Sequence, residues 1–375
     1  MRALLVATVL LFSLAAAQAQ TQTAPQLAGK AWVLADLSSG QVLAEEKADQ
    51  RFAPASLTKL MTAYVVFGAL REKALAATAE VQVSERAWHT GGSRMFIQPD
   101  KPVNVQELLL GLVVHSGNDA ALALAEALAG SEAAFVALMN REAARLGMAH
   151  TTYANATGFS APGHASTARD LYVLAAALIR DFPHEYARYY AQKEFRYNDI
   201  TQMNRNRLLW LDPSVDGGKT GHTEDAGYCL IASSQRGGRR LLSVLLGAST
   251  EYARTQESQK LLNWGYQNFD GVQLYTPGEA VKSVQVWKGA EATVAAGFAR
   301  GLVVTVPKGA AGTLRAELLT LPPVLAPVPK GQKVGVLRIA LGAEPLGEYP
   351  VVALERVVAA GFVGRAWDTL RLWVK

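Results

Sequence analysis

The segment Pro54-Ala-Ser-Leu-Thr-Lys59 places a serine and a lysine one helical turn apart. The apolar run 57–70 that overlaps it predicts a helix beginning near Ser56. Residues i and i+3 share a helix face, so the Lys59 amine can reach the Ser56 hydroxyl. A serine at a helix N-terminus becomes a nucleophile when a nearby amine accepts its proton. Taken alone, the segment fits a capping serine beside a solvated lysine equally well.

A second segment, Val114-His-Ser-Gly-Asn-Asp119, lies between two apolar stretches that both predict helices. A Ser-Gly-Asn turn at this place can present the Ser116 hydroxyl and the Asn118 amide to a cleft. The alternative is helix capping by either residue.

A third segment, Asp216-Gly-Gly-Lys-Thr-Gly-His-Thr223, precedes a predicted β-hairpin. On an edge strand, Lys219 and Thr220 would offer a cation and an open backbone to a substrate that ends in a carboxylate. The alternative is a turn with a solvated lysine. A phosphate-binding loop is excluded because the earlier glycine that its motif requires before Gly218 is absent.

The order SxxK, SxN, KTG is the signature of penicillin-binding proteins and serine β-lactamases. The chain resembles the low-molecular-mass penicillin-binding proteins, the serine-type D-alanyl-D-alanine carboxypeptidases of the penicillin-binding protein 5/6 type. Three longer stretches carry the same likeness: 112–119, Asn204-Arg-Asn206 and 218–228. The resemblance covers essentially the whole chain. It implies an enzyme that removes the terminal D-alanine from peptidoglycan pentapeptides, in cell-wall biogenesis and cell shape.

The resemblance assigns the catalytic steps to four residues. Ser56 would form an acyl-enzyme with the penultimate D-alanine, and Lys59 would act as its general base. Ser116 would relay a proton to the departing D-alanine. Asn118 would hold the substrate amide and position the lysine.

The same resemblance assigns substrate binding to five more residues. Lys219 would supply positive field near the terminal carboxylate and keep the catalytic lysine neutral by like-charge repulsion. Thr220 and Arg205 resemble carboxylate contacts. The oxyanion hole would combine the backbone N–H of the nucleophile with that of His222, the residue after Gly221.

Residues 155–170 contain no glutamate, unlike the loop that activates the deacylating water in the commonest serine β-lactamases. We therefore expect slow deacylation and inhibition by penicillin, with β-lactams acting as covalent inhibitors. Alternatives on the same fold are a DD-endopeptidase and a β-lactamase. A non-catalytic protein that binds peptidoglycan is an alternative of another class.

The predicted fold is α+β, a serine β-lactamase/transpeptidase-like domain whose antiparallel sheet is flanked by helices, over residues 24–275. Two apolar runs, 228–234 and 240–247, flank Gln235-Arg-Gly-Gly-Arg239 as a β-hairpin. After Thr276-Pro-Gly278, short β-type segments predict a small all-β domain over 276–360, a spacer or interaction module. Helices are predicted over 57–70, 105–112, 118–128, 132–146, 169–179 and 256–266.

The two ends of the chain are apolar in different ways. Residues 1–19 combine a positive start, an apolar run and an Ala-Gln-Ala site, which predicts a signal peptide removed after Ala19. Residues 361–375 place apolar side chains on one helical face and basic ones opposite, which predicts an amphipathic membrane-associating helix. The alternative is a helix packed on its own domain. We expect a periplasmic protein attached peripherally to the outer face of the inner membrane.

The amino-acid composition excludes several other classes of protein. Half of the 375 residues are hydrophobic and 18% are charged, which excludes a disordered chain. The formal net charge of +5 comes without a Lys/Arg run, which argues against nucleic-acid binding. Cys229 is the only cysteine and the histidines are scattered, so we expect no disulfide, no metal and no cofactor.

Overall fold

The computed structural model describes residues 23–320 and 323–373. The predicted signal peptide, residues 1–19, lies outside the described residues, as do the last two residues of the predicted terminal helix.

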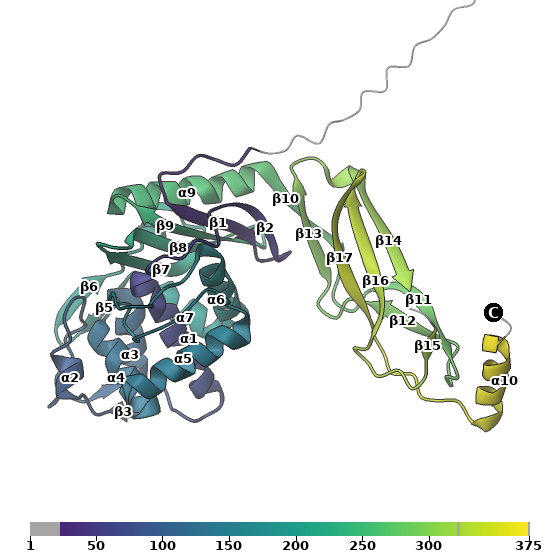
Figure 1. The fold of residues 1–375 in the computed structure, drawn as a ribbon, viewed down its shortest axis with the longest axis horizontal. Coiled ribbons are helices and arrows are strands. Elements are labelled where there is room, and N and C mark those ends of the chain that lie inside the picture. Colours follow the sequence, from purple (N-terminus) through teal and green to yellow (C-terminus); the bar gives the residue numbers. More distant parts are fainter. Residues whose placement is uncertain (1–22, 321–322, 374–375) are drawn as a thin grey trace, which may run out of the picture.

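A five-stranded antiparallel sheet forms the centre of the first domain (Figure 1). Its order is β2 (Gln41–Glu46), β1 (Ala31–Asp36), β9 (Arg239–Ala248), β8 (Gly227–Arg236) and β7 (Val215–Thr223). Helix α9 (Glu251–Asn268) covers one face and α6 (Ala168–Asp181) the other, so every residue of β1 is buried. The predicted antiparallel sheet flanked by helices is confirmed, and the segment 216–223 lies on its edge strand.

The helical part of this domain is built around α1 (Lys59–Arg71). This helix is apolar on nearly all sides, which is the pattern of a helix buried within a core. It follows a 3₁₀ turn, η1 (Ala55–Thr58), so the predicted helix over 57–70 begins in a tighter form. The other elements of this part are β3 (Glu80–Val81), α2 (Glu85–Trp88), β4 (Val103–Asn104), α3 (Val105–Leu110), η2 (Gly111–His115), α4 (Asn118–Ala129), α5 (Glu132–Leu146), α7 (Pro183–Tyr190), β5 (Glu194–Tyr197), β6 (Ile200–Met203) and α8 (Leu208–Leu211).

One predicted helix changes type before it ends. The sequence predicts a helix over 105–112, whereas α3 gives way to a π-helical turn, η2, at Gly111. The turn ends at Ser116, whose backbone is left-handed with φ 60° and ψ 36°. Such π turns are frequently found at functional sites, and this one ends at Ser116 just before α4 begins.

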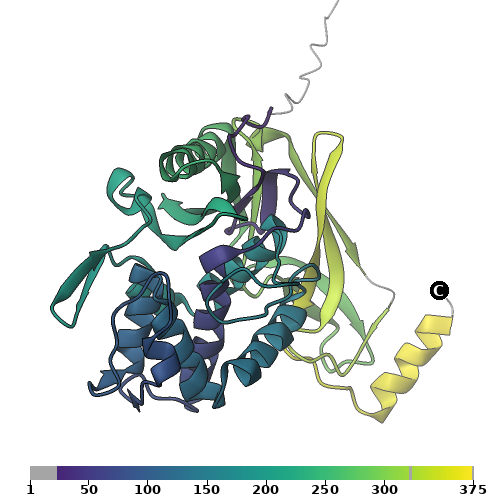
Figure 2. The same cartoon turned by 60° about the vertical axis from the view of Figure 1, so that its left-hand side comes forward.

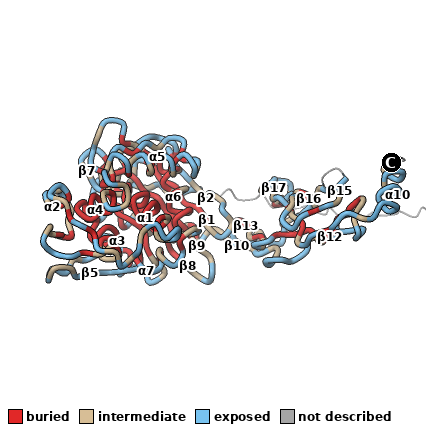
Figure 3. The backbone as a smooth tube through the Cα atoms, turned by 90° about the horizontal axis from the view of Figure 1, so that it is seen from below, coloured by how far each residue is buried: buried red, intermediate tan, exposed pale blue. Residues whose placement is uncertain are grey.

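The second domain is β-rich, as predicted. A six-stranded sheet has the order β14 (Leu314–Thr320), β16 (Lys333–Leu341), β17 (Glu344–Ala353), β12 (Thr293–Gly297), β11 (Ala280–Trp287) and β15 (Val324–Leu325). Strands β10 (Phe269–Tyr275) and β13 (Leu302–Pro307) form a separate pair, and a short 3₁₀ turn, η3, spans Ala311–Thr313. Buried valines dominate its core, which is separate from the core of the first domain (Figure 3).

A buried polar junction joins the two domains. The Asp36 carboxylate at the end of β1 is fully buried, pairs with Arg239, and accepts a hydrogen bond from the Thr305 hydroxyl at 2.8 Å. The Gln41 side-chain amide accepts from the Thr305 backbone N–H at 2.6 Å and donates to its carbonyl at 3.2 Å. Thr305 of β13 thus makes three hydrogen bonds to Asp36 and Gln41 of the first domain.

The chain ends in α10 (Phe362–Trp373), at the far end of the β-rich domain (Figure 2). Its polar face makes the contacts with that domain. Asp368 accepts a hydrogen bond from the Lys288 backbone N–H at 2.7 Å, and the Arg371 guanidinium lies 5.7 Å from the centroid of the Trp287 ring. The apolar side chains Phe362, Val363, Trp367 and Leu370 are exposed.

Over residues 23–320 and 323–373, no helix taken singly is long and apolar enough to cross a membrane. Helices α4 and α5 reach the required length and composition only as a pair bent by 87°.

Candidate active site

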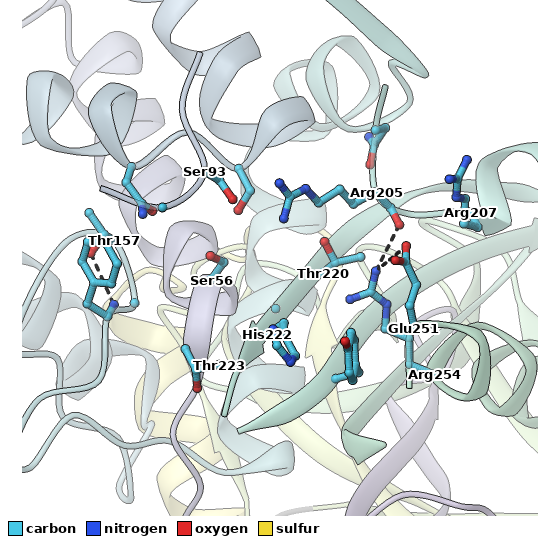
Figure 4. Close-up of a pocket in the computed structure, with 18 of the residues that line it drawn as sticks. Ser56, Ser93, Thr157, Arg205, Arg207, Thr220, His222, Thr223, Glu251 and Arg254 are labelled. Carbon is cyan, nitrogen blue, oxygen red and sulfur yellow. Dashed lines mark hydrogen bonds and ion pairs between the residues drawn. The ribbon is translucent and has the colours of Figure 1, made fainter. Parts of the chain in front are cut away.

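All three sequence segments meet at one cavity of about 500 Å³ between the sheet and the helical part (Figure 4). Seven of the nine predicted site residues line it: Ser56, Ser116, Asn118, Arg205, Thr220, Gly221 and His222. The other two, Lys59 and Lys219, are buried beneath it, and each contacts one of the lining serines.

Tight backbone packing presents Ser56 to the cavity. The preceding residue, Ala55, has φ 47°, an uncommon conformation for a residue with a side chain. Its carbonyl oxygen would lie only 1.9 Å from a Cβ placed on Gly158, whose own φ is +90°. On the other side, Gly221 of β7 brings its backbone against Pro54 and Ala55, where a Cβ would meet atoms at 3.2–3.3 Å. Glycine is required at position 158 for this close approach, whereas a side chain at position 221 would need its neighbours to shift by a few tenths of an ångström.

Lys59 is held by three oxygen atoms. Its Nζ lies 2.6 Å from the Thr157 carbonyl oxygen, 2.7 Å from Asn118 Oδ1 and 3.1 Å from Ser56 Oγ. The first two oxygens can only accept hydrogen bonds, so they take two N–H groups. In a neutral amine, the remaining lone pair then points at the Ser56 hydroxyl, which is the geometry of a base ready to accept a proton.

The environment of Lys59 favours this neutral form. Burial lowers its pKa to about 7, with the charge of Arg205 acting in the same direction and that of Asp119 opposing it. The cause differs from the sequence-based expectation, in which repulsion by Lys219 kept Lys59 neutral. Burial is the main reason here. The same burial, together with the charge of Lys59, lowers the pKa of Lys219.

Asn118 bridges Lys59 to the opposite wall of the cavity. While its Oδ1 accepts from the lysine, its Nδ2 donates to the Gly91 carbonyl oxygen at 2.8 Å, which fixes the amide orientation. The neighbouring Asp119 anchors this wall. Its carboxylate accepts the backbone N–H groups of Met95, Phe96 and Ile97 at 2.8–3.3 Å. No sequence pattern assigns this role to Asp119, because the three donors lie in an irregular loop more than 20 positions away.

Ser116 faces the second lysine. Lys219 donates to Ser116 Oγ at 2.8 Å and to its neighbour's carbonyl, Thr220 O, at 3.0 Å. The left-handed backbone at the end of η2 gives the serine this direction. A strand residue and a helix-terminal residue 103 positions apart are thus brought into direct contact.

The other end of the cavity is cationic. Arg205, Arg207 and Arg254 line it together with Glu251. Arg254 is buried, and it donates to Glu251 at 3.1 Å and to the backbone carbonyl of Arg205 at 3.3 Å. Sequence analysis missed this pair because α9 begins five residues earlier than predicted, with Thr250 as its N-cap. The capping threonine followed by an acidic residue was the available signal.

His222 has an exposed side chain that stacks on Tyr228, with the ring centroids 4.0 Å apart. The expectation that the backbone N–H of His222 serves the oxyanion hole remains a prediction.

A buried histidine outside the three segments supports the cavity wall. His164 Nδ1 accepts the Ala154 backbone N–H at 2.9 Å, so Nε2 carries the proton and donates to Thr58 Oγ1 at 2.8 Å. Burial lowers the pKa of His164 to about 4, so the ring stays neutral. It ties the loop that supplies the Thr157 carbonyl to the turn that carries the nucleophile.

Among residues 23–320 and 323–373, no group of three or more His, Cys, Asp and Glu side chains is arranged to hold a metal ion.

Comparison with known families gives two matches that together span most of the chain. Residues 18–250 match the family described as D-alanyl-D-alanine carboxypeptidase. Residues 269–359 match the family described as penicillin-binding protein 5, C-terminal domain.

Individual proteins are similar over nearly the full length. The D-alanyl-D-alanine carboxypeptidase DacC of Escherichia coli strain K12 is 44% identical over 357 residues, covering 93% of this chain and 89% of the relative. The crystal structure of penicillin-binding protein 5 from Haemophilus influenzae has a TM-score of 0.84 at 37% identity, covering 90% of this chain and 99% of that one. Penicillin-binding protein D2 from Listeria monocytogenes in its cefotaxime-bound form has a TM-score of 0.60 at 32% identity, over 65% of this chain and all of that one.

Proposed function

The chain belongs to the D-alanyl-D-alanine carboxypeptidase family of penicillin-binding proteins, and we propose that Ser56 and Lys59 carry the family's reaction in the cavity described above. The protein is a serine-type hydrolase that acts on peptidoglycan. One observation carries the assignment of the residues. Lys59 is buried, its two other contacts are carbonyl oxygens, and its third contact is the Ser56 hydroxyl.

Acylation begins with proton transfer from Ser56 to the neutral Lys59. The Ser56 oxygen attacks the carbonyl carbon of the penultimate D-alanine, and the negative oxygen that forms is stabilised by the backbone N–H groups of Ser56 and His222. The C–N bond then breaks, and the departing amine takes a proton through Ser116. The terminal D-alanine leaves as a free amino acid. Water finally hydrolyses the ester and restores the serine hydroxyl.

The cationic end of the cavity orients the substrate. The terminal carboxylate faces Arg205 and Thr220, which line that end, with the Lys219 amine directly below. A carboxylate beside Lys219 raises the pKa of this lysine again, because an opposite charge favours the protonated form. Substrate binding thus restores the positive charge of Lys219, which burial disfavours, when the terminal carboxylate has to be bound.

β-Lactams enter the same cavity and acylate the same serine. The Listeria monocytogenes relative was solved with cefotaxime bound, and this chain shares its fold. We propose that the penicilloyl ester on Ser56 persists, because residues 155–170 supply no glutamate to activate water. The glutamate that lines the cavity, Glu251, lies at the arginine end and is paired with Arg254.

Covalent labelling with a fluorescent penicillin tests the nucleophile. Ser56→Ala should abolish both the labelled band and the release of D-alanine from a pentapeptide. Ser283→Ala, on the surface of the β-rich domain, is the matched control and should label like the wild type. A labelled Ser56→Ala protein would refute the assignment. Release of free D-alanine, compared with cleavage of cross-linked dimers, separates the carboxypeptidase from an endopeptidase.

Because its substrate is peptidoglycan, the enzyme works outside the cytoplasm. We further propose that α10 attaches it peripherally to the outer face of the inner membrane, and that residues 1–19 direct its export. The orientation of α10 on the β-rich domain supports the proposed attachment. Asp368 and Arg371 occupy the docked face, so Phe362, Trp367 and Leu370 stay exposed on the other.

Flotation with vesicles that contain anionic phosphatidylglycerol tests the attachment. Deleting residues 361–375 should abolish binding, and Trp367→Ser should weaken it. Thr369→Ser, on the same helix, is the matched control that should bind like the wild type. Unchanged binding of the deletion variant would remove α10 as the anchor.

A further inference from the structure

An apolar shelf adjoins the arginine end of the catalytic cavity. It is a second cavity of about 250 Å³, lined by Met203, Arg207, Trp210 and Leu211. Two of these residues, Met203 and Arg207, also line the catalytic cavity. The two spaces are therefore neighbours that share a wall.

The local sequence explains why this shelf is apolar. The single-turn helix α8 has the sequence Leu208-Leu-Trp-Leu211, which leaves no polar side chain for its outer face. Its first two residues are buried in the core beneath the sheet. The other two point outward, so Trp210 is 36% exposed and Leu211 55% exposed, next to Met203 at 47%. Clustered exposed apolar side chains beside a catalytic cavity mark a binding surface.

The position of the shelf along the cleft indicates what it binds. Thr157, Ser56, Thr220, Arg205 and Arg207 follow one another across the site in Figure 4. The carboxylate of the leaving amino acid faces Arg205 in the proposed function, on which this inference rests. The shelf begins at Arg207, beyond that carboxylate and away from the acyl side of the scissile bond. A terminal D-alanine carries only a methyl group and cannot fill this space.

We propose that the shelf binds the side chain of a leaving D-amino acid larger than alanine. The substrates are peptides that end in D-Ala–D-Xaa with an aliphatic Xaa side chain. They include cross-linked stems, in which the D-configured leaving group continues into a second peptide. The chemistry is unchanged, because the amide between D-alanine and Xaa breaks, Xaa leaves with a protonated amine, and water releases the acyl group.

Two synthetic tripeptides test the shelf, diacetyl-L-Lys-D-Ala-D-Ala and the same peptide ending in D-norleucine. Each side-chain methylene placed on an apolar surface is worth up to about fourfold in kcat/KM. The wild type should hydrolyse the norleucine peptide at least as efficiently as the alanine peptide. Leu211→Ser and Trp210→Ser, which line the shelf but not the catalytic cavity, should each lower kcat/KM for the norleucine peptide by roughly five- to twentyfold, and for the alanine peptide by less than twofold.

Leu325→Ser provides the matched control, since this leucine is 46% exposed in the β-rich domain and far from the cleft in sequence. This control variant should leave kcat/KM unchanged for both peptides. A thermal melt of each variant identifies any that fails to fold. A purified cross-linked muropeptide dimer forms a third substrate. If Leu211→Ser slows cleavage of the dimer, the shelf binds cross-linked stems. If Leu211→Ser slows cleavage of the norleucine peptide alone, the shelf binds free peptide ends.

Two results would overturn the inference while leaving the proposed function standing. One is a wild type that cleaves the alanine peptide but rejects norleucine by more than tenfold. The other is a set of shelf variants that affect both peptides equally. A wild type that cleaves none of the peptides would instead contradict the proposed function itself.

Discussion

Acylation of Ser56 should follow the deprotonation of Lys59, with a midpoint near pH 7. Burial lowers the pKa of this lysine from its ordinary value of 10.5 to about 7, and only the neutral amine can accept the serine proton. The rate should therefore rise with pH through neutrality and then level off.

The size of the rise distinguishes a buried lysine from an ordinary one. With a pKa of about 7, the neutral fraction is about 9% at pH 6, about 50% at pH 7 and about 91% at pH 8. The acylation rate should thus increase about tenfold between pH 6 and pH 8 and then reach a plateau. An unperturbed lysine would give about a hundredfold increase over the same range and no plateau below about pH 10.

Stopped-flow measurement of the second-order acylation rate by benzylpenicillin gives this profile directly. The ligand carboxylate stays ionised over the range, so changes in rate report the enzyme. Arg205→Gln should move the midpoint toward higher pH, because the Arg205 charge helps to lower the pKa of Lys59. The plateau acylation rate of this variant should also be lower, since Arg205 is a proposed contact of the ligand carboxylate. Arg196→Gln, in a surface pair on the β5–β6 hairpin, is the control that should leave the midpoint unchanged.

A rate that climbs steadily to pH 10 would refute the reasoning, because it would show that burial does not neutralise Lys59. An acylation rate that does not change from pH 5 to pH 9 would also refute it, since another group would then be the base.

Two further predictions concern residues that support the site, and a third concerns the junction between the domains. Gly158→Ala should slow acylation by at least about a hundredfold and lower the melting temperature, because the new Cβ would lie 1.9 Å from the carbonyl oxygen of Ala55. Gly163→Ala is the control for backbone strain in the same assays, since Gly163 has a similar φ but open space around it. Asp119→Asn should shift the pH midpoint of acylation to lower pH, because the Asp119 charge raises the pKa of Lys59, and an unmoved midpoint would speak against this coupling. Asp36→Asn should destabilise the protein by roughly 2–4 kcal/mol in denaturant unfolding by leaving Arg239 without its charge partner, against less than about 1 kcal/mol for the exposed control Asp49→Asn.

The sequence was sufficient to predict the parts of the site that obey local rules. The spacing of Ser56 and Lys59 follows from helix geometry, and the edge position of Lys219 follows from the hairpin after it. The helix over 132–146 is found with the same bounds, because Ser131 caps it and Gly147 ends it in a left-handed conformation.

Features that depend on distant contacts could not be predicted in this way. The Thr157 carbonyl oxygen that contacts the buried Lys59 amine belongs to a loop about a hundred residues away, which no local pattern connects to the lysine. Likewise, the amphipathic pattern of α10 predicts a docked face but not which one. Leu372, an apolar residue on the polar side of the helical wheel, lines a cavity with Trp287 and so belongs to the docked face.

If α10 attaches the protein to a membrane as proposed, its docking on the β-rich domain affects how quickly and how reversibly the protein binds a bilayer. An isolated 12-residue helix is marginal in water, since its first turn fixes several residues for one hydrogen bond. In this protein, the contacts of Asp368 and Arg371 hold the helix formed and oriented beforehand. Adsorption therefore needs no coupled folding, and the chain entropy that a disordered tail would lose at the lipid surface has already been lost on folding. In the proposed attachment, α10 would therefore meet the lipid as a preformed helix, and its affinity would depend on its few exposed apolar side chains.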